Sequence, residues 1–317
     1  MQRISKILFM AESEMDNQQA FVQATTIAQN NQAEITVVGV IENLKTGKAT
    51  ESGLPDLLVK QKLEELQSLV QSVPVDGIPI DLKVLTGSAF IEIIREVIMS
   101  QQDLLIKPVE SKYGSEHQLF GGTDRKLLRK CPCPVWLFKS KEQQGYREIL
   151  VGLDYEPDNA ENEALNKHLL EIASSLALAD GSDLHILHVW EFQHESFLRS
   201  SRTGFSDAEV DDMIIEEVNT RKNWLDNFVA DYYGKLGAET TNYLNPKTFL
   251  IKGDVRKEFP NYVKEKGIEL VVMGTVGRTG LPGFVIGNTA EVILNQINCS
   301  VLAVKPSGFV SPVTLAE

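Results

Sequence analysis

The sequence predicts an α/β fold with two tandem domains, each built around a parallel β-sheet. Short apolar runs alternate with longer stretches of helical spacing, which is typical of a parallel sheet covered by helices on both faces. The chain also repeats itself: Gly87 recurs as Gly253, a spacing of 253 − 87 = 166 residues, and Lys139 recurs as Lys305 in the same register. A register kept through strands, a loop and a helix indicates an internal duplication.

The first copy is expected to span residues 1–141. Its strands are predicted from apolar, β-branched runs and its helices from the amphipathic stretches between them, the first of which follows Asp16. The predicted strands cover residues 6–10, 34–41, 80–85, 104–107 and 135–138, and the predicted helices cover residues 17–29, 55–71, 90–99 and 124–129.

The second copy is expected to span residues 146–307. Residues 148–154 repeat residues 6–12, including the acid at the end of the strand, and residues 184–189 repeat residues 35–40. The spacing then grows from 149 to 166, so 17 additional residues fall between the second and third strands. They lengthen a helical segment within residues 192–236, where Ser206 and Glu209 form a predicted capping box at the helix start.

A glycine motif follows the buried strand at residues 270–273. Gly274 and Gly277 are followed, after a nine-residue gap, by Gly287, Asn288 and Thr289, and helical spacing resumes at residue 290. Glycines allow backbone to approach a ligand closely, and a helix start offers unpaired N–H groups, so a phosphate is the expected guest. The alternative is that the glycines only permit a tight surface loop. Gly280, Pro282 and Gly283 predict a mobile flap in the gap.

Parallel strands joined by right-handed crossovers make each copy a flavodoxin-like (Rossmann-like) sheet, and ligands bind where the winding of such a sheet reverses. In the second copy this crevice would bring together Asp154, after the first strand, and Gly274, after the fourth. If a triphosphate binds there, Asp154 is expected to contact ribose or Mg²⁺. Proteins hold Mg²⁺ through one or two carboxylates plus phosphate oxygens. Asp154 could equally be a strand-end carboxylate that caps the following turn.

The glycine motif, together with the segment from Leu128 to Trp136 and the run from Gly287 to Glu291, resembles the tandem-domain universal stress proteins of Gram-negative bacteria. The resemblance covers essentially the whole chain. It implies five-stranded sheets in the order 3-2-1-4-5 and an ATP site, with Mg²⁺, in the second copy only. The nucleotide residues that it implies, with Val189 meeting adenine, are Asp154, Val189, Met273, Gly274, Gly277, Gly287, Asn288 and Thr289. Asn288 stands where ATP-binding relatives usually have Ser or Thr.

The first copy departs from the glycine motif. Pro108 lies opposite Gly274 and Ser111 opposite Gly277, and Glu110 between them adds negative charge where phosphate would sit. The sequence therefore predicts that the first copy does not bind ATP in this manner. We expect it to pack against the second copy as an internal dimer partner.

Composition limits the remaining function classes. A formal net charge of −13 and a pI near 5.0 disfavour direct nucleic-acid binding. The chain has no signal-peptide pattern and no membrane-length apolar stretch, so a cytoplasmic location is expected.

The cysteines and histidines do not indicate a metal site. Three cysteines do not make a disulfide framework, and Cys131 and Cys133 are interpreted as small buried residues in preference to half a metal site. His185 and His188 are expected on opposite faces of one strand.

The resemblance implies a stress-endurance protein, associated with survival of DNA-damaging and other stresses, without an established enzymatic reaction. No nucleotide-hydrolysis, serine-hydrolase or zinc-protease motif is present in the chain. The expected activity is ligand sensing or scaffolding, in which nucleotide occupancy of the second copy changes a partner-binding surface. A slow ATPase and a carrier of an apolar, lipid-like ligand are the alternatives.

Overall fold

The computed structural model describes residues 4–12, 14–42, 53–109, 120–140, 145–275 and 287–315. The chain divides into two compact units, each described here by itself. Unit 1 comprises Met1–Gly145 together with Thr275–Glu317, and unit 2 comprises Tyr146–Gly274. The last helix and strand of the second sequence copy therefore belong to unit 1.

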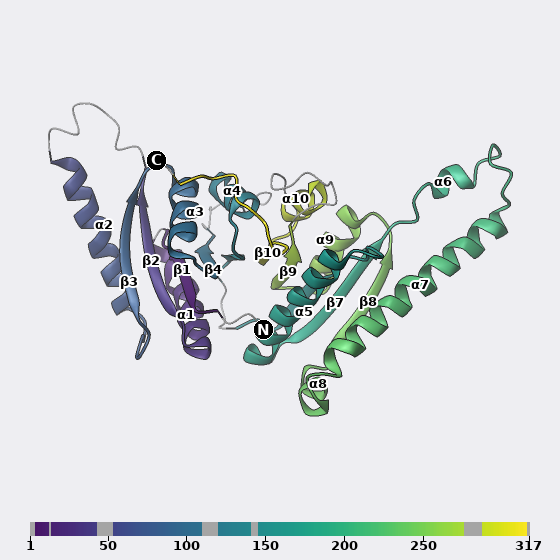
Figure 1. Ribbon diagram of the computed structural model, residues 1–317, viewed down its shortest axis with the longest axis horizontal. Helices are drawn as coiled ribbons and strands as arrows, with labels where there is room; N and C mark the ends of the chain where they lie inside the picture. Colours follow the sequence, from purple (N-terminus) through teal and green to yellow (C-terminus); the bar gives the residue numbers. More distant parts are fainter. Residues whose placement is uncertain are drawn as a thin grey trace. The chain divides into compact units, whose positions relative to one another are not determined.

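Unit 1 holds a sheet in the order β3-β2-β1-β4-β5-β10 (Figure 1). The first five strands are parallel, in the predicted order 3-2-1-4-5 for the first copy. The elements of this unit, in chain order, are β1 (Lys6–Met10), α1 (Glu14–Asn31), β2 (Glu34–Ile41), α2 (Leu54–Gln71), β3 (Ile80–Thr86), α3 (Ala89–Ser100), β4 (Leu104–Pro108), α4 (Gly122–Lys130), β5 (Val135–Phe138), α10 (Asn288–Leu294) and β10 (Ser300–Val304).

The central strands of unit 1 are buried over most of their length because helices cover both faces of a parallel sheet. In β1, Ile7, Leu8 and Phe9 are fully buried, and the Phe9 ring meets the edge of Phe21 from α1 at a centroid distance of 5.1 Å. The continuous apolar runs of the sequence therefore predicted these strands correctly.

At one edge of the unit 1 sheet, equivalent strands from the two sequence copies pair with each other. β5 and β10 are the fifth strands of their copies, and they pair antiparallel with Trp136 opposite Leu302. Polar contacts extend the pair: the Lys139 N–H donates to Ser300 Oγ at 3.0 Å, and Lys139 Nζ donates to the Asn298 side chain at 2.7 Å. Trp136 is only 1% exposed, so this pairing lies in the core of the unit.

Unit 2 holds four parallel strands in the order β8-β7-β6-β9, which is the predicted order for strands three, two, one and four of the second copy. Its elements are β6 (Glu148–Gly152), α5 (Ala160–Asp180), β7 (Asp183–Trp190), α6 (Glu195–Leu198), α7 (Asp207–Tyr233), α8 (Ala238–Leu244), β8 (Lys247–Lys252), α9 (Val255–Glu265) and β9 (Leu270–Gly274).

The additional residues of the second copy form a long helix with a short helix before it. α7 has 27 residues, against 18 in the matching helix α2. The predicted capping box is confirmed: the Ser206 hydroxyl accepts from the Glu209 N–H, and the Glu209 carboxylate accepts from the Ser206 N–H. Figure 1 shows α6 and the amino-terminal half of α7 extending beyond the strands of unit 2. The short helix α8, after α7, was not predicted.

The two histidines of β7 have separate partners, as their spacing predicts. His185 lies between the Tyr262 hydroxyl of α9 (2.7 Å) and the Glu148 carboxylate (2.8 Å). The His188 Nδ1–H donates to the Leu153 carbonyl (3.0 Å), while its Nε2 accepts from Arg221 of α7 (3.0 Å). Each imidazole is thus a satisfied core residue. Among the described residues, no helix combines the length and apolar character needed to cross a bilayer.

Candidate functional site

Four of the predicted nucleotide residues lie at the carboxyl edge of the unit 2 sheet. β6 and β9 are parallel neighbours with Val151 opposite Val272, and β7 pairs with β6 on its other side. Asp154 follows β6, Val189 is near the end of β7, and Met273 and Gly274 end β9. The crossover from β6 leads to β7, whereas β9 arrives from β8 at the far edge, so the winding reverses between β6 and β9. The predicted switch point is therefore present.

An asparagine of the following helix fixes the backbone at the strand-end acid. The Asp154 N–H donates to Asn166 Oδ1 at 3.1 Å, and Asn166 Nδ2 donates to the Asp154 carbonyl at 2.6 Å. Asn17 makes the same two bonds to Glu12 in the first copy, at 2.8 and 3.0 Å. The N-cap of α5 is Asn159, whose side chain accepts from two backbone N–H groups. Asp154 is thus held in place by Asn166 and is not the N-cap of this helix.

The glycine at the end of β9 is closely packed against α5. A β-carbon at Gly274 would lie 3.0 Å from Leu165 Cδ2 of α5, which is tighter than ordinary side-chain contacts allow. Val189 near the end of β7 and Met273 of β9 are buried, with 9% and 6% of their surface exposed. Close approach of α5 therefore supplies a structural reason for this glycine, alongside the ligand-binding reason that the sequence suggested.

The remaining predicted residues follow β9 and belong to unit 1. Gly287 is the N-cap of α10, which starts with Asn288 and Thr289. The Gly287 N–H donates to the Thr275 carbonyl at 2.9 Å. Gly277 and the predicted flap with Gly280, Pro282 and Gly283 lie outside the described residues.

In the first copy a buried lysine occupies the position that matches Met273. Lys107 Nζ lies 2.9 Å from a carboxylate oxygen of Glu12, 2.9 Å from one of Asp124 and 3.1 Å from the Pro108 carbonyl. Its side chain is 3% exposed. Burial alone would lower the pKa of Lys107, but attraction to Asp124 and Glu12 outweighs it and raises this pKa above the ordinary lysine value. Two carboxylates and one backbone carbonyl thus lie within 3.1 Å of this ammonium group.

Asp124 completes the arrangement by capping its own helix. Its second carboxylate oxygen accepts the Gly121 N–H at 2.7 Å, at the amino terminus of α4. A carboxylate of the chain thus lies where a helix start would otherwise attract an anionic ligand. In the second copy the matching residues are Met273 and Ala290, which carry neither charge. Sequence reasoning missed this pair, although a lysine ending the apolar run Leu104-Leu105-Ile106 was a visible signal.

A cluster of aromatic rings around Arg221 adjoins the strand ends of unit 2. The Arg221 guanidinium carbon lies 5.2 Å from the Tyr155 ring centroid and 5.1 Å from that of Trp190, within cation–π range. Arg221 also pairs with Glu217 at 2.6 Å. Trp224 packs against Tyr155 and His188, at 5.0 and 5.3 Å between centroids. Tyr155 and Trp190 are the chain neighbours of Asp154 and Val189, so α7 is attached directly beside the candidate residues.

A second buried lysine lies at the end of β10 in unit 1. Lys305 Nζ donates to the Leu128 carbonyl and to the Thr275 hydroxyl, and it lies 5.2 Å from the Phe309 ring centroid. Burial lowers the pKa of Lys305 to about 8. Its counterpart Lys139 also has a pKa lowered by burial. These lysines directly follow β5 and β10, the strands that pair the two copies.

The cysteines are buried, as predicted. Cys131 and Cys133 have sulfur atoms 3.5 Å apart, and none of the three cysteines forms a disulfide. Hydrogen bonding to Cys131, followed by burial, raises the pKa of the Cys133 thiol well above its usual value. Within the described part of the chain, no three His, Cys, Asp or Glu residues are grouped to hold a metal ion.

Comparison with known proteins identifies relatives of both copies. The sequence profile of the Universal stress protein family matches residues 3–139 and again residues 145–305. Universal stress protein E of Escherichia coli K12 is 28% identical over 246 residues, covering 76% of this chain and 73% of that protein. Universal stress protein E of Photorhabdus laumondii is 24% identical over 327 residues, covering 100% of each. The predicted resemblance to tandem proteins of Gram-negative bacteria is confirmed.

Solved structures agree on the fold. A functionally unknown protein from Pseudomonas aeruginosa PAO1 has a TM-score of 0.66 at 23% identity, covering 96% of this chain and 93% of that one. A universal stress protein from Archaeoglobus fulgidus has a TM-score of 0.56 at 16% identity, covering 96% and 98%. At these identities the likeness concerns the fold alone.

Proposed function

Because the chain belongs to the universal stress protein family, we propose that it acts in the cytoplasm as a ligand-sensing protein of the stress response, with ATP and Mg²⁺ as the ligand of its second copy. The curated relatives named above carry the name universal stress protein E, which places the chain among stress proteins. The finer role, endurance of DNA-damaging and other stresses, is part of this proposal.

The observation that carries the nucleotide proposal is the contrast between the two copies at one position. The first copy has Lys107 paired with Glu12 and Asp124, whereas the second has the uncharged Met273 beside Asp154 and Gly274. An anionic ligand in the first copy would have to displace a buried carboxylate from a buried ammonium group, which is costly. The second copy presents no such competitor at the matching residues. ATP is therefore proposed to bind only there, with Asp154 on ribose or Mg²⁺ and Val189 against adenine.

The first copy is proposed to serve as an internal dimer partner. The antiparallel pairing of β5 with β10, and the bonds of Lys139 to Ser300 and Asn298, support this role. Such pairing joins two equivalent strands with opposite directions, as a two-fold axis between identical subunits would.

The protein is proposed to bind ATP without turning it over. Phosphate release from Mg·ATP should then stay at background, both in the unaltered protein and in an Asp154→Ala variant. Release above background that disappears in Asp154→Ala would replace this proposal with the slow-ATPase alternative.

Titration calorimetry with ATP, in the presence and absence of Mg²⁺, tests the binding proposal. We expect one site per chain and affinity about tenfold weaker, or worse, in Asp154→Ala, since a charge-assisted contact is lost. The matched control is Asp183→Ala, because Asp183 lies at the opposite edge of the same sheet in an exposed pair with Lys247. Equal loss in both variants, or two sites per chain, would contradict the proposal. Native mass spectrometry of the purified protein would reveal a lipid-like mass if the carrier alternative holds.

A further inference from the structure

The additional residues of the second copy build a surface that the fold itself does not need. The first copy forms its sheet and helices without them, and the helix that they lengthen, α7, buries only Val210, Leu225 and Tyr233 along 27 residues. We use the term arm surface for residues 191–217, which comprise α6, the following loop and the amino-terminal part of α7. An insertion outside the shared core is a common place for a binding function.

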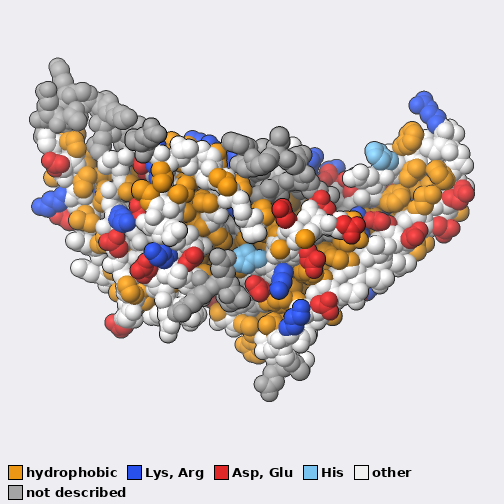
Figure 2. Space-filling model, viewed as in Figure 1, with side chains coloured by type: hydrophobic (Ala, Val, Ile, Leu, Met, Phe, Trp, Pro, Cys, Tyr) orange, Lys and Arg blue, Asp and Glu red, His pale blue; other side chains and the backbone are white. Residues whose placement is uncertain are grey.

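Apolar side chains gather on the arm surface. Phe197 is 58% exposed, Phe205 is 42% exposed and Ile215 is 57% exposed. Figure 2 shows hydrophobic side chains collected over α6 and the adjacent part of α7, with acidic side chains along the border. The same segment also contains half-buried apolar residues, namely Leu198, Met213 and Ile214. An exposed apolar group of this kind, rimmed by polar side chains, is typical of a protein-binding site.

The border of the arm surface is strongly acidic. Residues 191–217 contain eight carboxylates and two arginines, a net charge of −6. Arg199 is already engaged: it pairs with Asp211 at 2.6 Å, with Glu195 at 3.1 Å and with Asp207 at 3.4 Å. The positive charge that remains on the arm surface is therefore small, and the surrounding field attracts a cationic partner.

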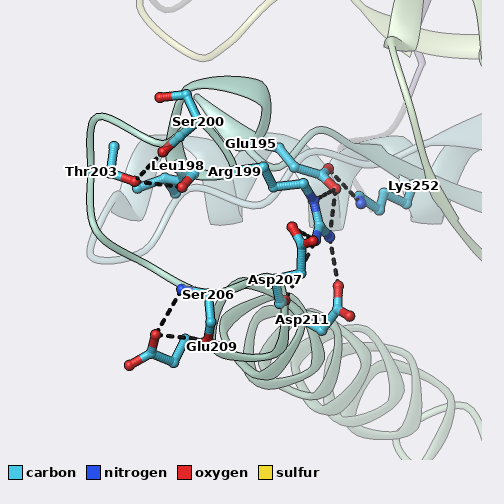
Figure 3. Close-up of polar contacts among 10 residues, drawn as sticks. All are labelled: Glu195, Leu198, Arg199, Ser200, Thr203, Ser206, Asp207, Glu209, Asp211 and Lys252. Carbon is cyan, nitrogen blue, oxygen red and sulfur yellow. Dashed lines mark hydrogen bonds and ion pairs between the residues drawn. The ribbon is translucent and has the colours of Figure 1, made fainter.

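Polar contacts hold the arm surface in one conformation before any partner arrives. Figure 3 shows Arg199 reaching from α6 to the start of α7, and Glu195 reaching to Lys252 at the end of β8 (2.6 Å). The Thr203 hydroxyl donates to the Leu198 carbonyl at 2.6 Å and closes the loop between the helices. Each exposed pair contributes little stability alone, but several together fix the position of α6. A preformed surface lowers the ordering cost of binding.

We propose that the arm surface binds a basic amphipathic helix of a partner protein, whose apolar face covers Phe197, Phe205 and Ile215 and whose Lys and Arg residues meet the acidic border. A helix in an apolar site uses side chains three and four residues apart as anchors, and basic flanks suit this border. A second copy of this chain is disfavoured, because pairing the surface with itself would bring the same carboxylates together. Anionic lipid is disfavoured for the same electrostatic reason.

The proposal supplies the partner surface that ligand sensing requires, so it rests in part on the proposed function. Its test is made without nucleotide, so that a failure here leaves ATP binding untouched. The probe is an 18-residue peptide of leucine and lysine at helical spacing, labelled for fluorescence anisotropy. The same composition in scrambled order and a glutamate version of the helix serve as probe controls.

We expect the leucine–lysine helix to bind the full chain and to bind at least about tenfold more weakly after Phe197→Ser with Phe205→Ser, since apolar anchors carry most interface energy. Asp212→Lys with Glu216→Lys should weaken binding similarly and flatten its salt dependence. The matched control is Leu57→Ser with Met99→Ser, two exposed apolar residues of unit 1 at 61% and 59% exposure. Circular dichroism establishes that each variant is folded.

Hydrogen exchange of the complex locates the peptide, and protection confined to residues 195–217 is expected. The proposal is overturned if the unit 1 control weakens binding equally, if the scrambled or glutamate peptide binds as well, or if protection lies elsewhere. It is also overturned in favour of self-association if the unliganded chain dimerises and Phe197→Ser with Phe205→Ser abolishes the dimer.

Discussion

The ammonium group of Lys107 lies 2.9 Å from a carboxylate oxygen of Asp124, and both side chains are almost wholly buried, at 3% and 6% exposure. The pair joins the end of β4 to the first turn of α4, where the second copy has Met273 and Ala290. The first copy thus has a buried ion pair at the end of its fourth strand, whereas the second copy has uncharged residues at the matching positions.

Lys107→Met should strongly destabilise unit 1, because it strips the partner from the buried carboxylates of Asp124 and Glu12. Breaking a buried pair costs about 3–5 kcal/mol in the free energy of unfolding. Adding Asp124→Asn should recover part of the loss, since the amide oxygen can still accept the Gly121 N–H without a charge. Urea denaturation of the single and double variants measures this. A double variant less stable than Lys107→Met would contradict the ion-pair account.

The buried Lys305 should make the free energy of unfolding depend on pH in the alkaline range. Its pKa is about 8 in the folded chain and 10.5 in the unfolded chain, so between these values the unfolded chain binds more protons. The free energy of unfolding should therefore gain a contribution as pH rises from 8 to 10.5. Lys305→Met removes the group, so the difference between the two proteins isolates it from tyrosine and cysteine titrations. Denaturant titrations at pH 7 to 10 measure this, and parallel pH profiles would refute the assignment.

Arg221→Ala should lower the free energy of unfolding of unit 2 by about 1–3 kcal/mol. It removes the stacking on Tyr155 and Trp190 and the bond to His188, and it leaves Glu217 without its cation. Lys222→Ala is the neighbouring control, because Lys222 and Asp226 form an exposed pair whose loss costs little. Intrinsic fluorescence follows unfolding, since Trp190 and Trp224 lie in the cluster. Equal effects of the two substitutions would argue against the packing role of Arg221.

Ser206→Ala should fray the start of α7 without unfolding the chain. The hydroxyl accepts the Glu209 N–H, and loss of such a cap costs a helix about 1 kcal/mol. Because this end of α7 is exposed, the cost should appear as faster amide exchange at residues 208–211, with an unchanged global midpoint. Ser206→Asp retains an acceptor and should exchange as the unaltered protein does. Slow exchange in Ser206→Ala would mean that Arg199 alone fixes the helix start.

The fold was readable from the sequence because its signals are local. Residues 6–10, 34–41 and 135–138 were predicted as strands with the bounds found in β1, β2 and β5, since continuous apolar runs mark strands buried on both faces. The capping box at Ser206 was equally local. The internal repeat then indicated which strand ends face one another, and so placed Asp154, Val189, Met273 and Gly274 at one edge of the sheet.

What the sequence did not reveal depends on side chains that meet across the fold. Asn17 and Asn166 perform the same task, yet they lie 5 and 12 residues after their acids, so no fixed register relates them. The contacts of Arg221 with Tyr155 and Trp190 join parts of the chain that only tertiary packing brings together. The pairing of β5 with β10 likewise required knowledge of how the fifth strands meet.

α7 is a single uninterrupted helix that carries Ile215 in its amino-terminal half and Arg221 less than two turns later, against the rings beside Asp154 and Val189. One helix thus carries residues of the arm surface and of the aromatic cluster beside the candidate site. If binding of a protein partner and binding of ATP both depend on the position of α7, the partner changes the affinity for ATP by the same factor by which ATP changes the affinity for the partner. The additional residues of the second copy thus give it a long helix that connects the arm surface with the candidate site, and the first copy has no equivalent.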